Sequence, residues 1–131
     1  MIGELECVII DCPSPHKLAE FYRTLIGGEV NKPDPRWLIE PGWATLHTPS
    51  GLVFCFAEVA DYQPPRWPDP DAPRQFHIDL KVPDLDEAGR QVIEAGGALL
   101  DDGGGTRRYR IFADPVGHPF CIIAIGRPPR G

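Results

Sequence analysis

Two stretches of the chain carry the same order of apolar and polar positions, about 70 residues apart. Each opens with an alternating apolar run, reaches a proline and continues into a segment whose apolar residues recur at helical spacing. Each segment then ends at a Gly-Gly pair and leads into a new apolar run. The two stretches are CVIIDCPSPHKLAEFYRTLIGGEV, from Cys7, and HIDLKVPDLDEAGRQVIEAGGALL, from His77. A repeat of this kind predicts a duplicated module.

Local signals mark the start of both expected helices. Ser14 is suited to the N-cap position, and Pro15 fits the first helical position, where its missing N–H costs nothing. In the second stretch, Asp84 followed by Glu87 has the spacing of a capping box. The Gly-Gly pairs then favour helix termination. The helices are predicted over Pro15 to Ile26 and Asp84 to Ala95.

Short apolar runs separated by turn residues predict the strands that follow each helix. In the first half they lie around Val30, from Trp43 to Thr48 and from Leu52 to Val59. In the second half they run from Ala98 to Leu100, Tyr109 to Ala113 and Pro119 to Ile125. A turn is expected at 114–117, and His47 and His118 are expected at the surface or in turns. Each half therefore reads as strand, helix and three further strands, or βαβββ.

A proline-rich segment, PPRWPDPDAP, divides the two halves and cannot form regular helix or central strand. We expect one domain over residues 1–131, made of a module at 1–63, a linker at 64–73 and a module at 74–131. The alternative is an undivided α+β sandwich with an accidental echo between its halves. The matched proline, helix and Gly-Gly pair favour duplication.

Composition narrows the function classes. The net charge of -6 argues against nucleic acid as a partner, because phosphate binding needs a basic surface. No apolar run reaches the length of a membrane span, and the acidic start of the chain lacks the basic region of a signal peptide. A cytoplasmic protein with reduced cysteines is expected. The four cysteines form no CxxC pair, so a zinc ribbon is not predicted.

The duplicated plan resembles the vicinal-oxygen-chelate superfamily of glyoxalases, bleomycin-resistance proteins and dioxygenases, and most closely its glyoxalase-like domain family. The segments that carry the resemblance are DCPSPHKLAEFY, PPRWPDPDAPRQFHIDL, VPDLDEA and ADPVGHPFCI. The resemblance implies an α+β fold in which two βαβββ modules form a curved, barrel-like sheet around a cleft. It also implies a small-molecule ligand and, by analogy, a homodimer.

Metal-dependent members of that superfamily place ligands at one equivalent point on each of four strands. The resemblance carries these points onto Cys7, Cys55, His77 and Cys121, with Ala57 as the alternative to Cys55 on the same face of its strand. Glyoxalase I and extradiol dioxygenases use histidines and carboxylates there, whereas this chain keeps one histidine and has no carboxylate at these points. No metal cofactor is therefore expected, and neither of those two activities.

A zinc site built from Cys7, Cys55, His77 and Cys121 is the alternative, because thiolate and imidazole both suit tetrahedral zinc. Against it, cysteine commonly lines apolar cores, and no local spacing motif supports a metal. His77 is the candidate catalytic residue, as a base or ligand whose state Asp79 would tune.

Aromatic residues complete the expected binding cleft. The predicted cleft residues are Cys7, Cys55, His77, Asp79, Cys121, Trp37, Trp43 and Tyr109. Arg107, Arg108 and Arg110 either hold an anionic group or belong to a solvated loop. The predicted function is binding of a small, partly apolar molecule without the usual divalent metal. The alternative is a lyase or isomerase in which His77 is central and a non-standard metal, for example zinc, is bound.

Overall fold

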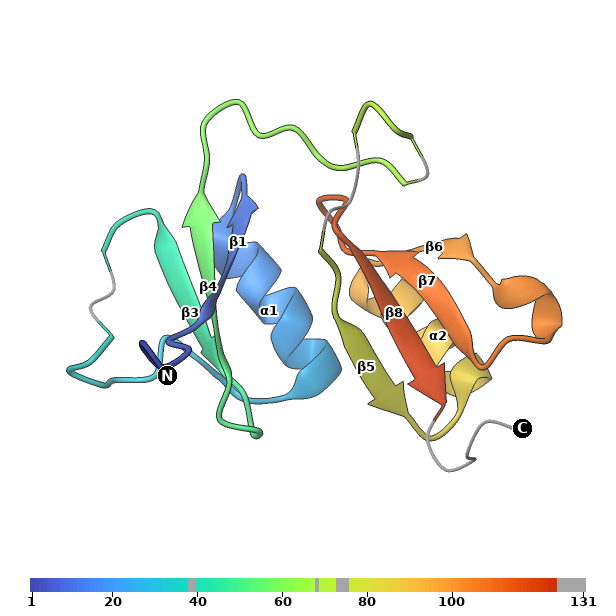
Figure 1. Ribbon diagram of the computed structural model, residues 1–131, viewed down its shortest axis with the longest axis horizontal. Helices are drawn as coiled ribbons and strands as arrows, with labels where there is room; N and C mark the ends of the chain where they lie inside the picture. The colour runs from blue at the N-terminus through green and yellow to red at the C-terminus, as the bar shows by residue number, and fades with distance from the viewer. Residues whose placement is uncertain (38–39, 68, 73–75, 125–131) are drawn as a thin grey trace. The chain divides into compact units, whose positions relative to one another are not determined.

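The computed structural model describes residues 1–37, 40–67, 69–72 and 76–124. The chain divides into two compact units, Met1–Tyr62 and Gln63–Gly131. Each unit contains one α-helix and one open four-stranded sheet (Figure 1). Within the described residues, no helix is both long and apolar enough to cross a membrane.

The first unit follows the predicted βαβββ order. Its sheet has the order β1-β4-β3-β2, in which β1 runs parallel to β4 and the other pairs are antiparallel. The helix α1 lies across one face of this sheet and packs on β3 and β4. The elements are β1 (Val8–Cys12), α1 (Pro15–Ile26), β2 (Glu29–Val30), β3 (Trp43–His47) and β4 (Val53–Glu58).

The second unit repeats this topology strand for strand. Its sheet order is β5-β8-β7-β6, again with one parallel pair, β5 and β8, and two antiparallel pairs. The elements are β5 (Asp79–Val82), α2 (Leu85–Ala95), β6 (Ala98–Asp101), β7 (Tyr109–Ala113) and β8 (Pro119–Ala124), with a short 3₁₀ turn at Gly103–Gly105. The α+β fold of two βαβββ modules is therefore confirmed.

Aromatic packing under each helix forms the core. In the first unit, Tyr22 of α1 stacks on Phe54 and Phe56 of β4 at ring-centroid distances of 6.5 and 5.8 Å. In the second unit, Phe112 and Phe120 stack at 6.1 Å beneath α2, and both are almost completely buried. Burying such rings removes a large apolar area from water, which stabilises the fold. The face of each sheet that points away from its helix carries the candidate site residues, among them Cys55 and Cys121.

The helix ends match their sequence signals with one difference. Asp84 caps α2, since its carboxylate accepts the N–H of Glu87 at 2.9 Å. The Glu87 side chain binds Arg90 instead of completing the reciprocal half of a capping box. Ser14 occupies the N-cap of α1, but its side chain makes no capping hydrogen bond to the described residues.

The second glycine of each Gly-Gly pair is required by close packing. A Cβ on Gly28 would collide with the backbone carbonyl of His47, and one on Gly97 would lie 2.6 Å from Val92 Cγ1. Gly96 supplies the left-handed turn that ends α2, with φ of 112°. The pairs therefore turn the chain sharply from each helix into its next strand. Residues 68 and 73 of the predicted linker, and Ile125 of the predicted last strand, lie outside the described residues.

Candidate functional site

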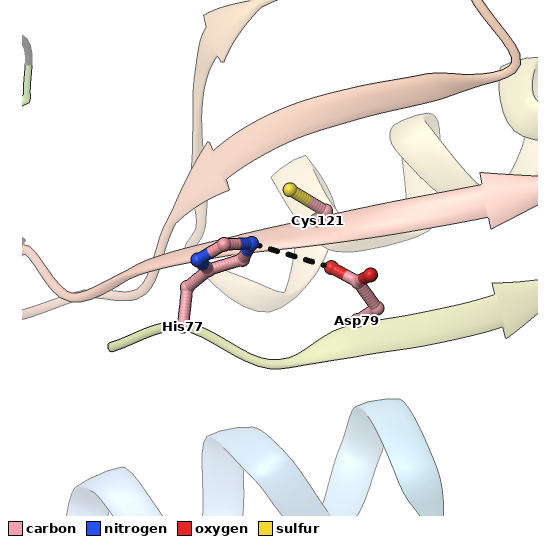
Figure 2. Close-up of side chains that lie close together, drawn as sticks. All are labelled: His77, Asp79 and Cys121. Atoms are coloured by element: carbon pink, nitrogen blue, oxygen red, sulfur yellow. Dashed lines mark ion pairs between the residues drawn. The ribbon is translucent and has the colours of Figure 1, made fainter. Parts of the chain in front are cut away.

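The second sheet brings three chemically active side chains to one face. Asp79 begins β5 and is the register partner of Cys121 in β8. His77 lies two residues before Asp79, just ahead of the strand, where the N–H of Cys121 donates to the carbonyl of Ile78 at 2.9 Å. Because strand residues alternate between faces, His77 and Asp79 point to the same side as Cys121. Figure 2 shows the three side chains gathered there.

The ligand atoms of His77, Asp79 and Cys121 all lie within 4.8 Å of one another. His77 Nε2 is 3.6 Å from Asp79 Oδ1, which makes the two an ion pair when the imidazole is protonated. The side chains of His77 and Asp79 are 35% and 57% exposed, whereas Cys121 is 6% exposed and forms the floor. The cluster is therefore open to solvent on one side and closed on the other.

This donor set fits a divalent metal of intermediate softness. Imidazole nitrogen, thiolate sulfur and carboxylate oxygen are all zinc ligands, and three protein ligands leave a position for water or substrate. Purely oxygen-ligated ions such as Mg²⁺ would be poorly served by the sulfur. The carboxylate comes from Asp79, which the sequence placed beside His77 as a tuning group and not as a ligand.

Apolar side chains surround the cluster on the same face. Ile111 of β7 is the register partner of Cys121 and is 4% exposed. Ile123 lies two residues beyond Cys121 and is paired with Tyr109. The face thus combines a small polar group of residues with an apolar surround, which is the usual make-up of a small-molecule site.

Arg107, in the loop before β7, and Arg110, in β7, make their contacts with residues of the second unit. The Arg107 guanidinium donates to both carboxylate oxygens of Asp101 at 2.8 Å and to the Tyr109 hydroxyl, and it lies 4.9 Å from the centre of the Tyr109 ring. Hydrogen bonds from the Gly103 N–H and from Arg107 lower the pKa of Asp101. Arg110 pairs with Asp86 at 2.6 Å. Arg107 and Arg110 therefore already bind carboxylates.

The first sheet brings together the other two predicted points. Cys55 in β4 is the register partner of Ile9 in β1 and of Thr45 in β3. Cys7 lies two residues before Ile9, close enough to Cys55 to influence the pKa of its thiol. Burial first, and then the neighbouring Cys7 thiol, raise the pKa of Cys55 to about 12. Ile9 pairs with Cys55 as Asp79 pairs with Cys121, so Cys55 and Cys121 hold equivalent register positions in the two sheets.

Trp37 and Trp43 belong to the first unit. Trp43 begins β3 and is 38% exposed, while the Trp37 ring stands edge-on to His47 at 5.7 Å. His47, expected at the surface or in a turn, ends β3 directly before the turn and is half-buried, with its Nε2 atom buried. The alternation of Trp43, Thr45 and His47 along one strand face was the signal that could have placed it.

Two buried polar atoms on β3 have no hydrogen-bond partner among the described residues, Thr45 Oγ1 and His47 Nε2. They project from the same face as Cys55. By contrast, His118 directly follows the predicted turn and binds the buried Asp114 carboxylate through Nδ1 at 2.7 Å. Asp114 also accepts the N–H groups of Val116 and His118, so this residue holds the turn together.

The four strand points thus fall into two pairs, one on each sheet: Cys7 with Cys55, and His77 with Cys121. The second pair gains Asp79, whereas the equivalent position in the first sheet is Ile9. The convergence of all four points, together with Trp37, Trp43 and Tyr109, in one cleft stays a prediction.

Comparison with known proteins identifies relatives of the whole fold. Residues 7–123 match the model of the glyoxalase-like domain family. No curated protein matches the chain. A glyoxalase/bleomycin resistance protein/dioxygenase family enzyme from Burkholderia phytofirmans PsJN is similar with a TM-score of 0.70 and 16% identity, over 95% of this chain and 100% of that one.

Fosfomycin resistance proteins share the fold as well. The FosX protein of Mesorhizobium loti has a TM-score of 0.67 at 13% identity, covering 94% of this chain and 92% of its own. A mutant of FosX from Listeria monocytogenes, solved with Mn(II) and 1S,2S-dihydroxypropylphosphonic acid, has a TM-score of 0.66 at 17% identity, covering 96% and 95%. At these identities the likeness concerns the fold.

Proposed function

The chain belongs to the glyoxalase-like domain family, and from that premise we propose that it binds a small, partly apolar molecule at the second sheet. We further propose that His77, Asp79 and Cys121 hold a divalent metal ion of the zinc type there. The observation that carries this proposal is the approach of their three ligand atoms to within 4.8 Å of one another. All three ligands come from β5, from the residues just before it and from the neighbouring strand β8, so the cluster is complete within the second sheet.

The surroundings support a ligand that is polar at one end. Ile111 and Ile123 offer apolar contact beside the cluster, and the exposed sides of His77 and Asp79 leave access from solvent. A bound metal would act as a Lewis acid toward a carbonyl or phosphoryl oxygen, or toward water. Asp79 would help to orient His77 and to balance the charge. The reaction class that fits is the lyase or isomerase type.

The sequence-based expectation of binding without a metal remains the rival proposal. It is supported by the absence of a carboxylate at the four strand points, and by the small size of the cysteines that occupy three of them. In that case His77 alone would orient the ligand by hydrogen bonding. The two proposals differ in whether chelation abolishes binding.

Cobalt(II) titration of the purified chain tests the metal. We expect one Co²⁺ per chain with a near-ultraviolet thiolate-to-cobalt band that Zn²⁺ removes by displacement and that excess Mg²⁺ leaves unchanged. Cys121→Ser should abolish the band, and His77→Ala or Asp79→Asn should weaken binding by about tenfold or more.

Two control variants match the tested residues. Cys55→Ser removes the register-equivalent cysteine of the first sheet, and His16→Ala removes an exposed histidine of α1. Both should keep the cobalt band. If the unaltered chain binds no Co²⁺ or Zn²⁺, or if Cys55→Ser loses the band while Cys121→Ser keeps it, the metal proposal is wrong. Binding without a metal would then be the favoured function.

A further inference from the structure

The first sheet carries a pair of thiols that the proposed metal site does not use. Cys55 lies in β4 directly opposite Ile9, and Cys7 precedes β1 by one residue on the same face as Ile9. Cys7 therefore lies diagonally across from Cys55 at the start of the parallel β1–β4 pair, close enough to contribute to the raised pKa of Cys55. All four cysteines of the chain, each within the described residues, are reduced.

The two thiols differ in their access to solvent. Cys7 is half-buried and lies in the segment leading into β1, whereas Cys55 is 5% exposed. Burial and the contact with Cys7 raise the pKa of Cys55 to about 12, so Cys55 keeps its proton at neutral pH. Because Cys7 is the more exposed of the two, a reagent from solvent meets Cys7 first.

A second feature marks this face as a place for a small polar molecule. Thr45, the register partner of Cys55 across β3 and β4, is 5% exposed, and its Oγ1 is unpartnered among the described residues. A buried hydroxyl without a partner has lost its hydrogen bonds to water without replacing them, which destabilises the fold. A small hydrogen-bonding molecule beside Cys55 would satisfy it, and a hydroperoxide can both donate and accept such a bond.

We propose that Cys7 and Cys55 form a two-thiol site that a hydroperoxide oxidises to a disulfide, with Cys7 as the attacking sulfur and Cys55 as the resolving one. The site lies entirely within the first unit. It uses none of the residues proposed to hold the metal, so either proposal can fail without the other.

The chemistry balances with the hydroperoxide as the only oxidant. The Cys7 thiolate attacks one peroxide oxygen, the O–O bond breaks, and the departing oxygen takes a proton to leave as water or an alcohol. Cys7 is then a sulfenic acid. The Cys55 sulfur attacks the Cys7 sulfur, its proton goes to the departing hydroxyl, and water leaves. Two thiols have lost two electrons to the peroxide, and one S–S bond has formed.

Closure requires the segment that leads into β1 to approach β4, because disulfides favour Cα–Cα distances of about 4.4–6.8 Å. Cys7 precedes the first paired residue of β1, Val8, so this movement breaks no pair of the β1–β4 ladder.

The remaining cysteines are placed differently. Cys12 lies on the helix-facing side of β1, is fully buried and donates from Sγ to the carbonyl of Ala57 at 3.6 Å. Cys121 lies in the second unit, in the cluster with His77. Neither shares a sheet face with Cys7 and Cys55, so we expect oxidation to be confined to the pair.

The test treats the reduced full-length chain with a small excess of hydrogen peroxide at neutral pH, alkylates it with N-ethylmaleimide and maps its peptides by mass spectrometry. We expect a Cys7–Cys55 cross-linked peptide, loss of two of the four titratable thiols, and reversal by dithiothreitol. Cys55→Ser should stop at the sulfenic acid, so dimedone should label Cys7 in that variant and not in the unaltered chain.

Cys121→Ser is the matched control, since it removes the equivalent cysteine of the other sheet and should leave the cross-link intact. Circular dichroism of each variant establishes that it is folded. Cys7 oxidised to sulfinic acid while Cys55 stays alkylated, or a disulfide that joins Cys7 to Cys121 or to a second chain, would overturn the proposal. Cys7→Ser should lose the cross-link, and a disulfide persisting in it would do the same.

Discussion

At Cys55, two effects act on the same proton. Burial in the first sheet disfavours the thiolate, and the neighbouring Cys7 thiol adds to this, so the pKa rises from 9.0 to about 12. In the unfolded chain the thiol would ionise near its ordinary pKa. Folding therefore holds a proton that the unfolded chain releases at alkaline pH, which links stability to pH.

The stability contributed by this group is complete below pH 9 and is lost as pH rises from about 9 toward 12. At pH 10 the loss should be on the order of 1 kcal/mol, because each pKa unit of unmatched ionisation costs roughly that much. Urea unfolding at pH 8 and pH 10 measures it. Cys55→Ser should show a smaller decrease between the two pH values by about this amount, and an equal decrease in both proteins would contradict the assignment.

The two helix starts differ in what holds them. Asp84 accepts the Glu87 N–H at 2.9 Å and also places a negative charge at the positive end of α2. Ser14 makes no such bond among the described residues, and α1 begins instead with Pro15, whose φ is already helical. Equivalent positions of the repeat thus use different physical means to begin a helix.

Asp84→Ala should therefore destabilise the chain by about 1 kcal/mol, the usual cost of losing a side-chain cap. Ser14→Ala is its control at the equivalent position and should change the free energy of unfolding by no more than a few tenths of that. Chemical denaturation of both variants at neutral pH makes the comparison. Equal losses in the two would mean that Ser14 caps α1 in solution.

Elements governed by local signals were predictable, whereas strand partners were not. The helices followed from their apolar spacing, from Pro15 and Asp84 at their starts and from the glycines at their ends. The choice between Cys55 and Ala57 depends on which residue of β4 is paired with Ile9. That pairing joins two segments that are far apart in the sequence, so local patterns do not reveal it. The alternation of β5 placed Asp79 beside His77, but only the pairing of β5 with β8 adds Cys121.

His47 also shows that local sequence does not predict features that depend on strand pairing. A histidine next to Thr-Pro-Ser-Gly has the local signature of a turn, and the turn does follow at once. The residue is nevertheless half-buried, with Nε2 shielded from solvent, because β3 is a middle strand between β4 and β2 and the Trp37 ring contacts it. Burial of this kind depends on strand order, which local sequence does not contain.

At the scale of the whole molecule, duplication is visible in the strand registers. Ile9 pairs with Cys55 and Asp79 pairs with Cys121, while Thr45 and Ile111 take the third position of each set. The two modules thus share a backbone framework and differ in the side chains placed on it. The first holds two thiols beside a hydroxyl, and the second holds a thiol beside an imidazole and a carboxylate.

If the framework alone positions the metal ligands, the second cluster can be rebuilt on the first sheet. Cys7→His with Ile9→Asp would set imidazole, carboxylate and the Cys55 thiol at the equivalent positions, and Ile9 is 54% exposed, so a charged residue is tolerable there. Cys55 and Cys121 have nearly the same exposure, 5% and 6%. In a Cys121→Ser background, which lacks the native site, the double substitution should restore a cobalt–thiolate band.

The rebuilt site should bind more weakly than the native one, by about ten- to a hundredfold, because the residues around it were not arranged to orient the new ligands. Cys7→His alone, in the same background, is the control and should not restore the band, since two ligands without the carboxylate leave the set incomplete. A folded double variant without the band would mean that the equivalence of the two sheets stops at the backbone. A band in the control would mean that the carboxylate is dispensable, and Asp79 would then lose its place among the proposed ligands.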